Sequence, residues 1–305
     1  MFEQYNLHSK MTSVTNLHLD KLRNFFQLSP PLPEQKAIAN YLDTKTAQCD
    51  RKIDLLTQKA TLYGNLKQSL INETVTRGLD KSVSMKDSGI EWIGEVPEHW
   101  EVCRAKNAVK KIGNGVTPRG GSEVYTDSGI PFLRSQNVYD DGLRLDNVSF
   151  IPVRIHDDMK NSQLQTGDIL INITGASIGR TCMVSAGLGA ANINQHIAFM
   201  RIKHWFNAFY ISLYLKSPFA KNYIQIEQNG ASKEAFNLSQ IANIPFILPP
   251  LSEQKVIADY LDTKTAQIDQ IIQTINTQIE KLKELRKTLI NDVVTGKIKV
   301  IGNEQ

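Results

Sequence analysis

The stretch PPLPEQKAIANYLDTKTAQ, residues 30–48, returns 219 positions later as PPLSEQKVIADYLDTKTAQ, residues 249–267. Aligned without gaps, residues 30–50 and 249–269 agree at 17 of 21 positions. The spacing is too long for a solenoid, whose repeats recur at about 20–50 residues. We therefore interpret the two copies as a duplicated helical element that holds a different module between them.

Each copy predicts a helix that leads into a heptad seam. Pro33 suits a first helical turn, where a missing N–H leaves no hydrogen bond unmade, and Glu34 there complements the helix dipole. Beyond each copy, apolar side chains recur four and three residues apart, which is the pattern of a coiled coil. The seam residues that we expect to pair are Ile53, Leu56, Tyr63 and Leu70 in the first run and Ile268, Ile272, Ile275, Ile279, Leu282 and Leu289 in the second.

A basic residue interrupts each seam at the equivalent position, Lys67 in the first run and Arg286 in the second. Neither helix has a wide apolar face, so each needs a partner, and the obvious partner is the other copy. At about 1.5 Å per residue, each long helix would reach on the order of 45 Å. We interpret the helix pair as a spacer that fixes the distance between whatever lies at its ends.

The residues between the copies have a different composition. Short β-rich runs such as residues 130–133, 168–173 and 195–202 are separated by glycine-containing turns. We therefore expect an α+β fold, with one α+β domain flanked by two long helices that pair as an antiparallel coiled coil. At the repeat's offset the N-terminal residues align with the end of this domain, so we interpret them as the tail of a second, mostly missing copy. The expected divisions are 1–29, 30–86, 87–248 and 249–301.

Composition excludes several classes of protein. The hydrophobic content of 41% is ordinary, and no apolar run is long enough to cross a membrane. The N-terminus lacks the layout of a signal peptide. Three scattered cysteines indicate a reducing compartment and neither a disulfide framework nor a zinc site, so we expect a cytoplasmic protein. The net charge of +4 permits a nucleic-acid partner without requiring one.

No catalytic residues, metal site or cofactor site are expected. The run NIPF at residues 243–246 is superficially similar to the tetrad of amino-methyltransferases, but Ile occupies its second position. Residues 175–179 follow a predicted strand yet lack the residues of a P-loop or a dinucleotide fingerprint. The six histidines are dispersed. We expect this chain to perform no chemistry itself.

Binding is better supported. Over residues 102–134 six basic residues stand against Glu123 and Asp127, and a second basic set follows an acidic stretch. This distribution suits one positive face of a DNA-binding domain, although charge alone is more typical of an ordinary solvated surface. Asn and Gln side chains pair with adenine, and Arg with guanine. The candidate DNA-contacting residues are Thr117, Arg119, Arg134, Ser135, Gln136, Asn137, Thr174, Ser177, Arg180, Asn194, Gln195, Lys203 and Lys233.

Several motifs occur together. Besides the two repeat copies, the chain contains DSGIEWIGEVPEHW at residues 87–100, GVTP at 115–118, PFLR at 131–134 and GDIL at 167–170. With these motifs, the chain resembles over nearly its whole length the specificity subunit of Type I restriction–modification systems. The resemblance implies that the chain reads one half of a bipartite site in double-stranded DNA. It also implies that the helices set the gap between half-sites and dock the modification (methyltransferase) subunits, with a motor-nuclease subunit joining through the complex.

The resemblance implies as well that S-adenosylmethionine and ATP are bound by the partner subunits, so that this chain needs no cofactor. A complete member of the family has two recognition domains, whereas this chain has one and a 29-residue remnant. Three arrangements remain open: a homodimer that presents two identical domains, a complex with a second specificity fragment, and a truncated remnant. In the last case the chain would only dock modification subunits and dampen the system.

Overall fold

The computed structural model describes residues 28–229 and 235–300. These residues form two compact units, one made of Leu62–Ile271 and the other of the chain up to Thr61 and from Ile272 onward. Residues 1–29, which we interpret from the sequence as the tail of a second domain copy, lie almost wholly outside the described residues. Among the residues described, no helix combines the length and the hydropathy that a membrane crossing requires.

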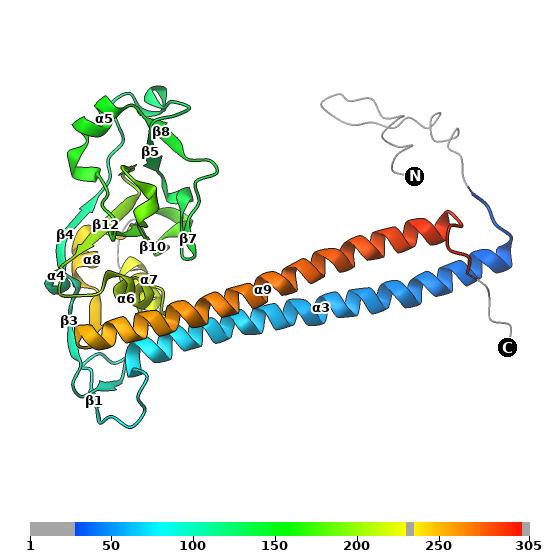
Figure 1. Ribbon diagram of the computed structural model, residues 1–305, viewed down its shortest axis with the longest axis horizontal. Helices are drawn as coiled ribbons and strands as arrows, with labels where there is room; N and C mark the ends of the chain where they lie inside the picture. The colour runs from blue at the N-terminus through cyan, green and yellow to red at the C-terminus, as the bar shows by residue number, and fades with distance from the viewer. Residues whose placement is uncertain (1–27, 230–234, 301–305) are drawn as a thin grey trace. The chain divides into compact units, whose positions relative to one another are not determined.

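Two long helices carry the repeat copies, α3 (Leu32–Arg77) and α9 (Leu251–Val294). Each is one continuous helix through the LDTKTAQ segment. Within each unit the two helices run side by side in opposite directions (Figure 1). The expected α+β fold with an antiparallel pair of long helices is confirmed.

All of the predicted seam side chains are buried or half-buried. In the unit formed by Leu62–Ile271, Ile268 is buried, while Tyr63 and Leu70 are half-buried. In the other unit Ile275 and Ile279 are buried. The remaining seam residues are half-buried: Ile53, Leu56, Ile272, Leu282 and Leu289.

A four-stranded antiparallel sheet, the main sheet, forms the centre of the globular part. Its strand order is β10-β9-β12-β4, so β12 lies between β9 and β4 and runs antiparallel to both. The strands are β4 (Val109–Asn114), β9 (Ile169–Asn172), β10 (Thr181–Met183) and β12 (Ile197–Ile202).

A second sheet has the order β11-β5-β8, with β11 (Asn192–Ile193) parallel to β5 (Ile130–Leu133) and β8 (Ser149–Ile151) antiparallel to β5. Three antiparallel strand pairs complete the β-structure: β1 (Met85–Asp87) with β2 (Glu95–Pro97), β3 (Glu101–Arg104) with β13 (Pro245–Leu248), and β6 (Val138–Tyr139) with β7 (Gly142–Leu143). The shorter α-helices are α4 (Ala105–Ala108), α5 (Val153–Asp158), α6 (Ala208–Leu215), α7 (Pro218–Asn229) and α8 (Leu238–Asn243).

The compact units divide inside the two long helices, whereas the expected domains divide at the helix ends. The reason lies in the core of the globular part, which takes Ile71 and Val75 from α3 and Ile257 and Leu261 from α9. The Tyr210 hydroxyl joins this core, since its oxygen lies 3.2 Å from the Val75 carbonyl oxygen and 2.9 Å from that of Ile247. Burial of these apolar side chains ties the inner ends of both helices to the domain.

Candidate nucleic-acid interface

One end of the main sheet brings three connecting segments together. Because β12 pairs with both neighbours, Ala198 lies opposite Asn114 at the end of β4, and Ile197 lies opposite Asn172 at the end of β9. The residues that precede β12 therefore lie between those that follow β4 and those that follow β9. This arrangement places predicted DNA-contacting residues from three segments beside one another.

Gly115 makes this close approach possible. Its amide donates to the Ile197 carbonyl over 3.0 Å, just after β4 ends. A Cβ atom at this position would lie 2.1 Å from the Ile193 carbonyl oxygen, so any side chain would push the two segments apart. The GVTP motif thus supplies the residue that the packing demands.

Four side chains form a hydrogen-bonded line across this end of the sheet, and we call Thr117, Gln195, His196 and Thr174 the polar row. The Thr117 hydroxyl donates to the Gln195 Oε1 atom. The Gln195 Nε2 and His196 Nε2 atoms are 3.1 Å apart, and His196 Nδ1 lies 2.7 Å from Thr174 Oγ1. Thr117 and Gln195 are exposed, so the row is accessible to a ligand.

Three of these residues were predicted from the sequence, and His196 was not. His196 directly follows the predicted residues Asn194 and Gln195, and this position could have suggested it. A single histidine, however, has no sequence pattern that distinguishes a binding residue from a packing residue. The contact of His196 with Thr174 depends on the pairing of β9 with β12, which the sequence did not reveal.

A second polar group adjoins the row where β9 ends. The Asn172 side-chain amide donates to the Ser135 carbonyl over 2.8 Å and to the Ser177 hydroxyl over 3.1 Å. Asn172 is fully buried, so it holds the turn after β9 against the segment after β5. The predicted residues Ser135 and Ser177 are therefore brought together, and Thr174 lies in the same turn.

Two side-chain amides that were predicted to read bases form hydrogen bonds inside the domain instead. Asn137 is 2% exposed; its Oδ1 accepts from the Arg134 amide and its Nδ2 donates to the Arg144 carbonyl. Asn194 is buried as well, and its Oδ1 accepts from the His196 amide. Both residues hold loops in place, because both polar atoms of Asn137 and the oxygen of Asn194 are already bonded and little of either side chain reaches solvent. Gln136, which directly precedes Asn137 in the sequence, is exposed.

The predicted arginines lie at three separate places. Arg134 is half-buried next to the second polar group, and its buried Nε has no partner among the described residues. Arg119 lines a cleft of about 730 Å³ together with Thr117 and Arg154. Arg180 lies over the Tyr139 ring at 4.7 Å from its centroid.

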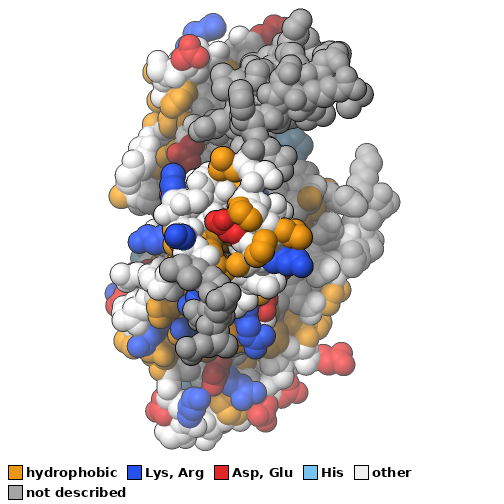
Figure 2. Space-filling model, turned by 90° about the vertical axis from the view of Figure 1, so that its right-hand side faces the viewer, with side chains coloured by type: hydrophobic (Ala, Val, Ile, Leu, Met, Phe, Trp, Pro, Cys, Tyr) orange, Lys and Arg blue, Asp and Glu red, His pale blue; other side chains and the backbone are white. Residues whose placement is uncertain are grey.

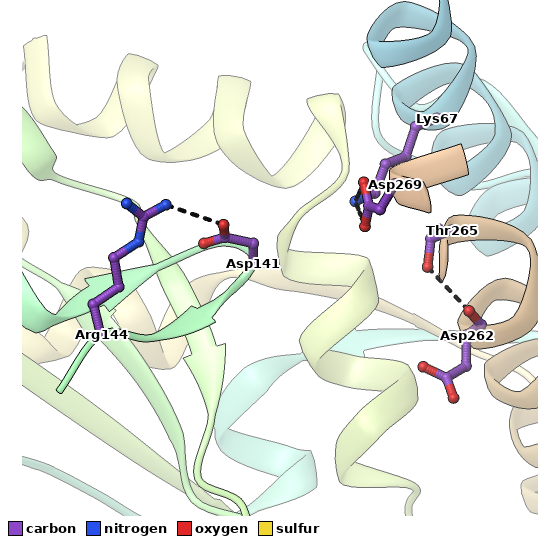
Figure 3. A network of polar contacts seen from close by, with 6 residues as sticks. All are labelled: Lys67, Asp141, Arg144, Asp262, Thr265 and Asp269. Carbon is purple, nitrogen blue, oxygen red and sulfur yellow. Dashed lines mark hydrogen bonds and ion pairs between the residues drawn. The ribbon is translucent and has the colours of Figure 1, made fainter. Parts of the chain in front are cut away.

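Arg144 contacts the same Tyr139 ring at 4.0 Å and also pairs with Asp141. Tyr139, Arg144, Arg180 and Asp141 line a second cleft of about 500 Å³ together with Lys67, Lys216 and Asp269. Figure 3 shows two ion pairs of this cleft, Arg144 with Asp141 and Lys67 with Asp269. Burial lowers the pKa of Lys216 in this cleft. Both cations and carboxylates line the cleft, so it has no single sign of charge.

Lys203 lies apart from the other candidates. It follows β12, whereas Gln195 precedes that strand, so the two residues are at opposite ends of the main sheet. Its Nζ donates to the Asn107 carbonyl over 2.7 Å and lies 5.7 Å from the Trp205 ring centroid. The last candidate, Lys233, lies outside the described residues.

The basic residues do not form one positive patch on the face drawn in Figure 2, where Lys and Arg side chains are interspersed with acidic and hydrophobic ones among the described residues. Arg201, part of the second basic set, is bound by the fully buried Asp168 through two bonds of 2.8 Å. Within the described part of the chain, no three His, Cys, Asp or Glu residues are arranged to hold a metal ion. Polar atoms at the sheet end therefore define this candidate site better than net charge does.

Comparison with known proteins agrees with the resemblance found in the sequence. Residues 97–281 match the family model described as Type I restriction modification DNA specificity domain. The chain is 25% identical to the Type I restriction enzyme EcoBI specificity subunit of Escherichia coli over 96% of its own length and 63% of that protein. It is 26% identical to the MjaVIII specificity subunit of Methanocaldococcus jannaschii over 93% of its length and 65% of that protein. The chain thus spans less than two thirds of the length of either relative.

Solved structures share the fold. A chain from a structure concerned with complex assembly and conformational transition of the type I R-M system superposes with a TM-score of 0.73 at 21% identity, covering 96% of this chain and 67% of that one. The HsdS subunit from Thermoanaerobacter tengcongensis gives a TM-score of 0.51 at 19% identity, covering 97% and 68%. The combination of long helices and an α+β domain therefore occurs in both of these structures.

Proposed function

The chain belongs to the family of the Type I restriction modification DNA specificity domain, and on this basis we propose that it is a non-catalytic, DNA-reading subunit. In this proposal it directs modification and restriction subunits to one half of a bipartite target in double-stranded DNA. Residues 87–248 act as the recognition domain, and residues 30–86 and 249–301 act as the spacer. Cofactor binding belongs to the partner subunits.

The observation that carries DNA reading is the polar row. Sequence is read by hydrogen bonds to base edges, which requires exposed donors and acceptors held in a defined arrangement. Thr117 and Gln195 meet this requirement because they are exposed and also bonded to one another. The nearby cations Arg119 and Arg134 are available for phosphates, which position a protein on the duplex without reading its sequence.

Docking of modification subunits is supported by exposed leucines at equivalent positions of the two copies. Leu66 on α3 and Leu285 on α9 are 219 positions apart, as the repeats are, and are 53% and 56% exposed. About half of each leucine side chain therefore stays accessible to a partner on an otherwise polar helix surface. A pair of them at equivalent positions suits two copies of one partner, each of which covers one leucine.

The alternative function is suggested by partial coverage of the relatives. The sequence covers 63% and 65% of two specificity subunits, and in this proposal residues 87–248 form one recognition domain. A half-subunit of this kind could dock modification subunits without productive DNA reading and so dampen the system. A homodimer, or a complex with a second specificity fragment, would instead supply the missing half of the site.

One experiment separates these arrangements. The chain is co-expressed with its cognate modification subunits in a methylation-free host, and adenine methylation is mapped across the genome. A bipartite motif with two identical inverted halves supports a homodimer, and a motif with two different halves requires a second fragment. Absence of methylation, with the subunits still co-purifying, would overturn DNA reading and support the docking-only alternative.

A further inference from the structure

The side-chain amide of Gln195 is held at both of its ends. Its oxygen accepts a hydrogen bond from the Thr117 hydroxyl, and its nitrogen lies 3.1 Å from the His196 Nε2 atom. An amide oxygen has two lone pairs and an amide nitrogen carries two protons. One acceptor position and one donor therefore stay free on Gln195, whose side chain is exposed.

The hydrogen bonds of the row form a continuous chain through Gln195 and His196. Since the Gln195 nitrogen can only donate, His196 Nε2 is the acceptor of that bond. On its other side the ring contacts the hydroxyl of Thr174, with Nδ1 lying 2.7 Å from Oγ1. Thr117 and His196 together thus hold the plane of the amide in place, and one donor and one acceptor stay free whichever way round the amide lies.

A fixed donor beside a fixed acceptor matches one base. In the major groove adenine presents the N7 acceptor next to the N6 donor, whereas guanine presents two acceptors there. We propose that Gln195 reads one adenine of the target by a bidentate pair of hydrogen bonds and that Thr117 and His196 are positioning residues for this contact. The proposal rests on the DNA-reading function above and names the residue and the base that carry part of it.

Other polar side chains nearby do not have this combination. The amides of Asn137 and Asn194 are buried and bonded inside the domain. Thr174 and Ser177 are half-buried. Gln195 alone among the described members of the polar row and its neighbouring group is an exposed amide that is also bonded at both its oxygen and its nitrogen.

The test uses the complex of the chain with its modification subunits. The methylated motif is first mapped, and binding is then measured on duplexes in which each A·T pair of the half-site is replaced in turn by G·C. For Gln195→Ala we expect discrimination to fall at one A·T position by about 10-fold to 100-fold, the range expected for loss of a bidentate contact, and the mapped motif to become degenerate there. The other positions keep their preference.

Matched variants separate positioning from folding. Thr117→Val removes the hydroxyl and should relax the same single position, whereas Thr117→Ser retains the hydroxyl and should preserve it. His196→Ala should also relax that position. Gln165→Ala is the control, since Gln165 is an exposed glutamine that precedes β9 and so lies at the other end of the main sheet.

The outcomes distinguish two failures. If the Gln195→Ala complex methylates the wild-type motif with unchanged discrimination, or if the relaxed position is a G·C pair, the assignment of Gln195 is overturned while DNA reading stands. If the wild-type complex methylates nothing, DNA reading fails and the assignment fails with it.

Discussion

Lys67 on α3 and Asp269 on α9 form an ion pair in which Nζ lies 2.6 Å from a carboxylate oxygen. In the other unit, Arg286 and Asp50 form an ion pair of 2.9 Å. The four residues occupy two equivalent positions in the two repeat copies, since 50 corresponds to 269 and 67 to 286. Each cation that interrupts a seam therefore binds an aspartate of the other repeat copy. The two ion pairs favour the register in which these residues lie opposite one another.

The Lys67–Asp269 pair can be tested by exchanging its charges. Lys67→Asp places two carboxylates together and should lower the free energy of unfolding, and adding Asp269→Lys should restore most of the loss. Because Asp269 is half exposed, we expect a coupling of about 0.5–1 kcal/mol that shrinks in 1 M salt. Urea denaturation of the four proteins of the cycle measures it. Strictly additive effects would show that the pair contributes no register preference.

Asp168 and Arg201 form the most buried ion pair of the globular part, with Asp168 fully buried and Arg201 19% exposed. Asp168→Ala leaves the guanidinium unpaired and should reduce the free energy of unfolding by about 3–5 kcal/mol. Replacing both residues, as in Asp168→Leu with Arg201→Met, should recover much of this loss. Thermal and urea unfolding measure both. A double variant as unstable as Asp168→Ala would contradict this account.

The exposed leucines can be tested for docking without disturbing the fold. Leu66→Asp and Leu285→Asp should change the free energy of unfolding by no more than about 0.5 kcal/mol, because both side chains are solvated. Each should weaken binding of modification subunits by about 10-fold, the effect of losing one apolar contact. Titration of the chain with purified modification subunits gives the affinities. Leu145→Asp, at an exposed leucine of the globular part, is the control, and an equal loss there would refute the assignment.

Cys182 makes stability depend on alkaline pH. Burial raises the pKa of its thiol to about 12 from the ordinary value of 9.0. Above pH 9 the unfolded chain therefore releases a proton that the folded chain retains, so stability falls with rising pH by up to about 1.4 kcal/mol per unit. Cys182→Ala should reduce this slope between pH 9 and 10.5. The difference in the free energy of unfolding between the two proteins at pH 7 reports packing alone and is the reference. An unchanged slope of stability against pH would exclude the Cys182 thiol as the source of the alkaline loss.

Periodicity predicted the helices well. Three features are local properties of the chain: the heptad spacing, the equivalent cations Lys67 and Arg286, and the α+β composition of the middle segment. They could be recognised without coordinates. The boundaries of the compact units could not, because they depend on Ile71, Val75, Ile257 and Leu261 packing into the core of the globular part.

The candidate site was only partly predictable. Residue type alone favoured Asn137, Asn194 and Gln195 equally, since all three are loop amides. Strand pairing then buried the first two and left Gln195 exposed between Thr117 and His196. Lys203 was separated from the others by the length of β12.

The repeat, its seam and the family resemblance could thus be recognised from the sequence alone. Helices and heptads follow from apolar residues spaced three and four positions apart, which is a local property of the chain. The pairing of seam cations with aspartates of the other copy, and the meeting of three segments in the polar row, were decided by tertiary structure. Both depend on which strands and helices become neighbours, and that is settled by burial of side chains far apart in sequence.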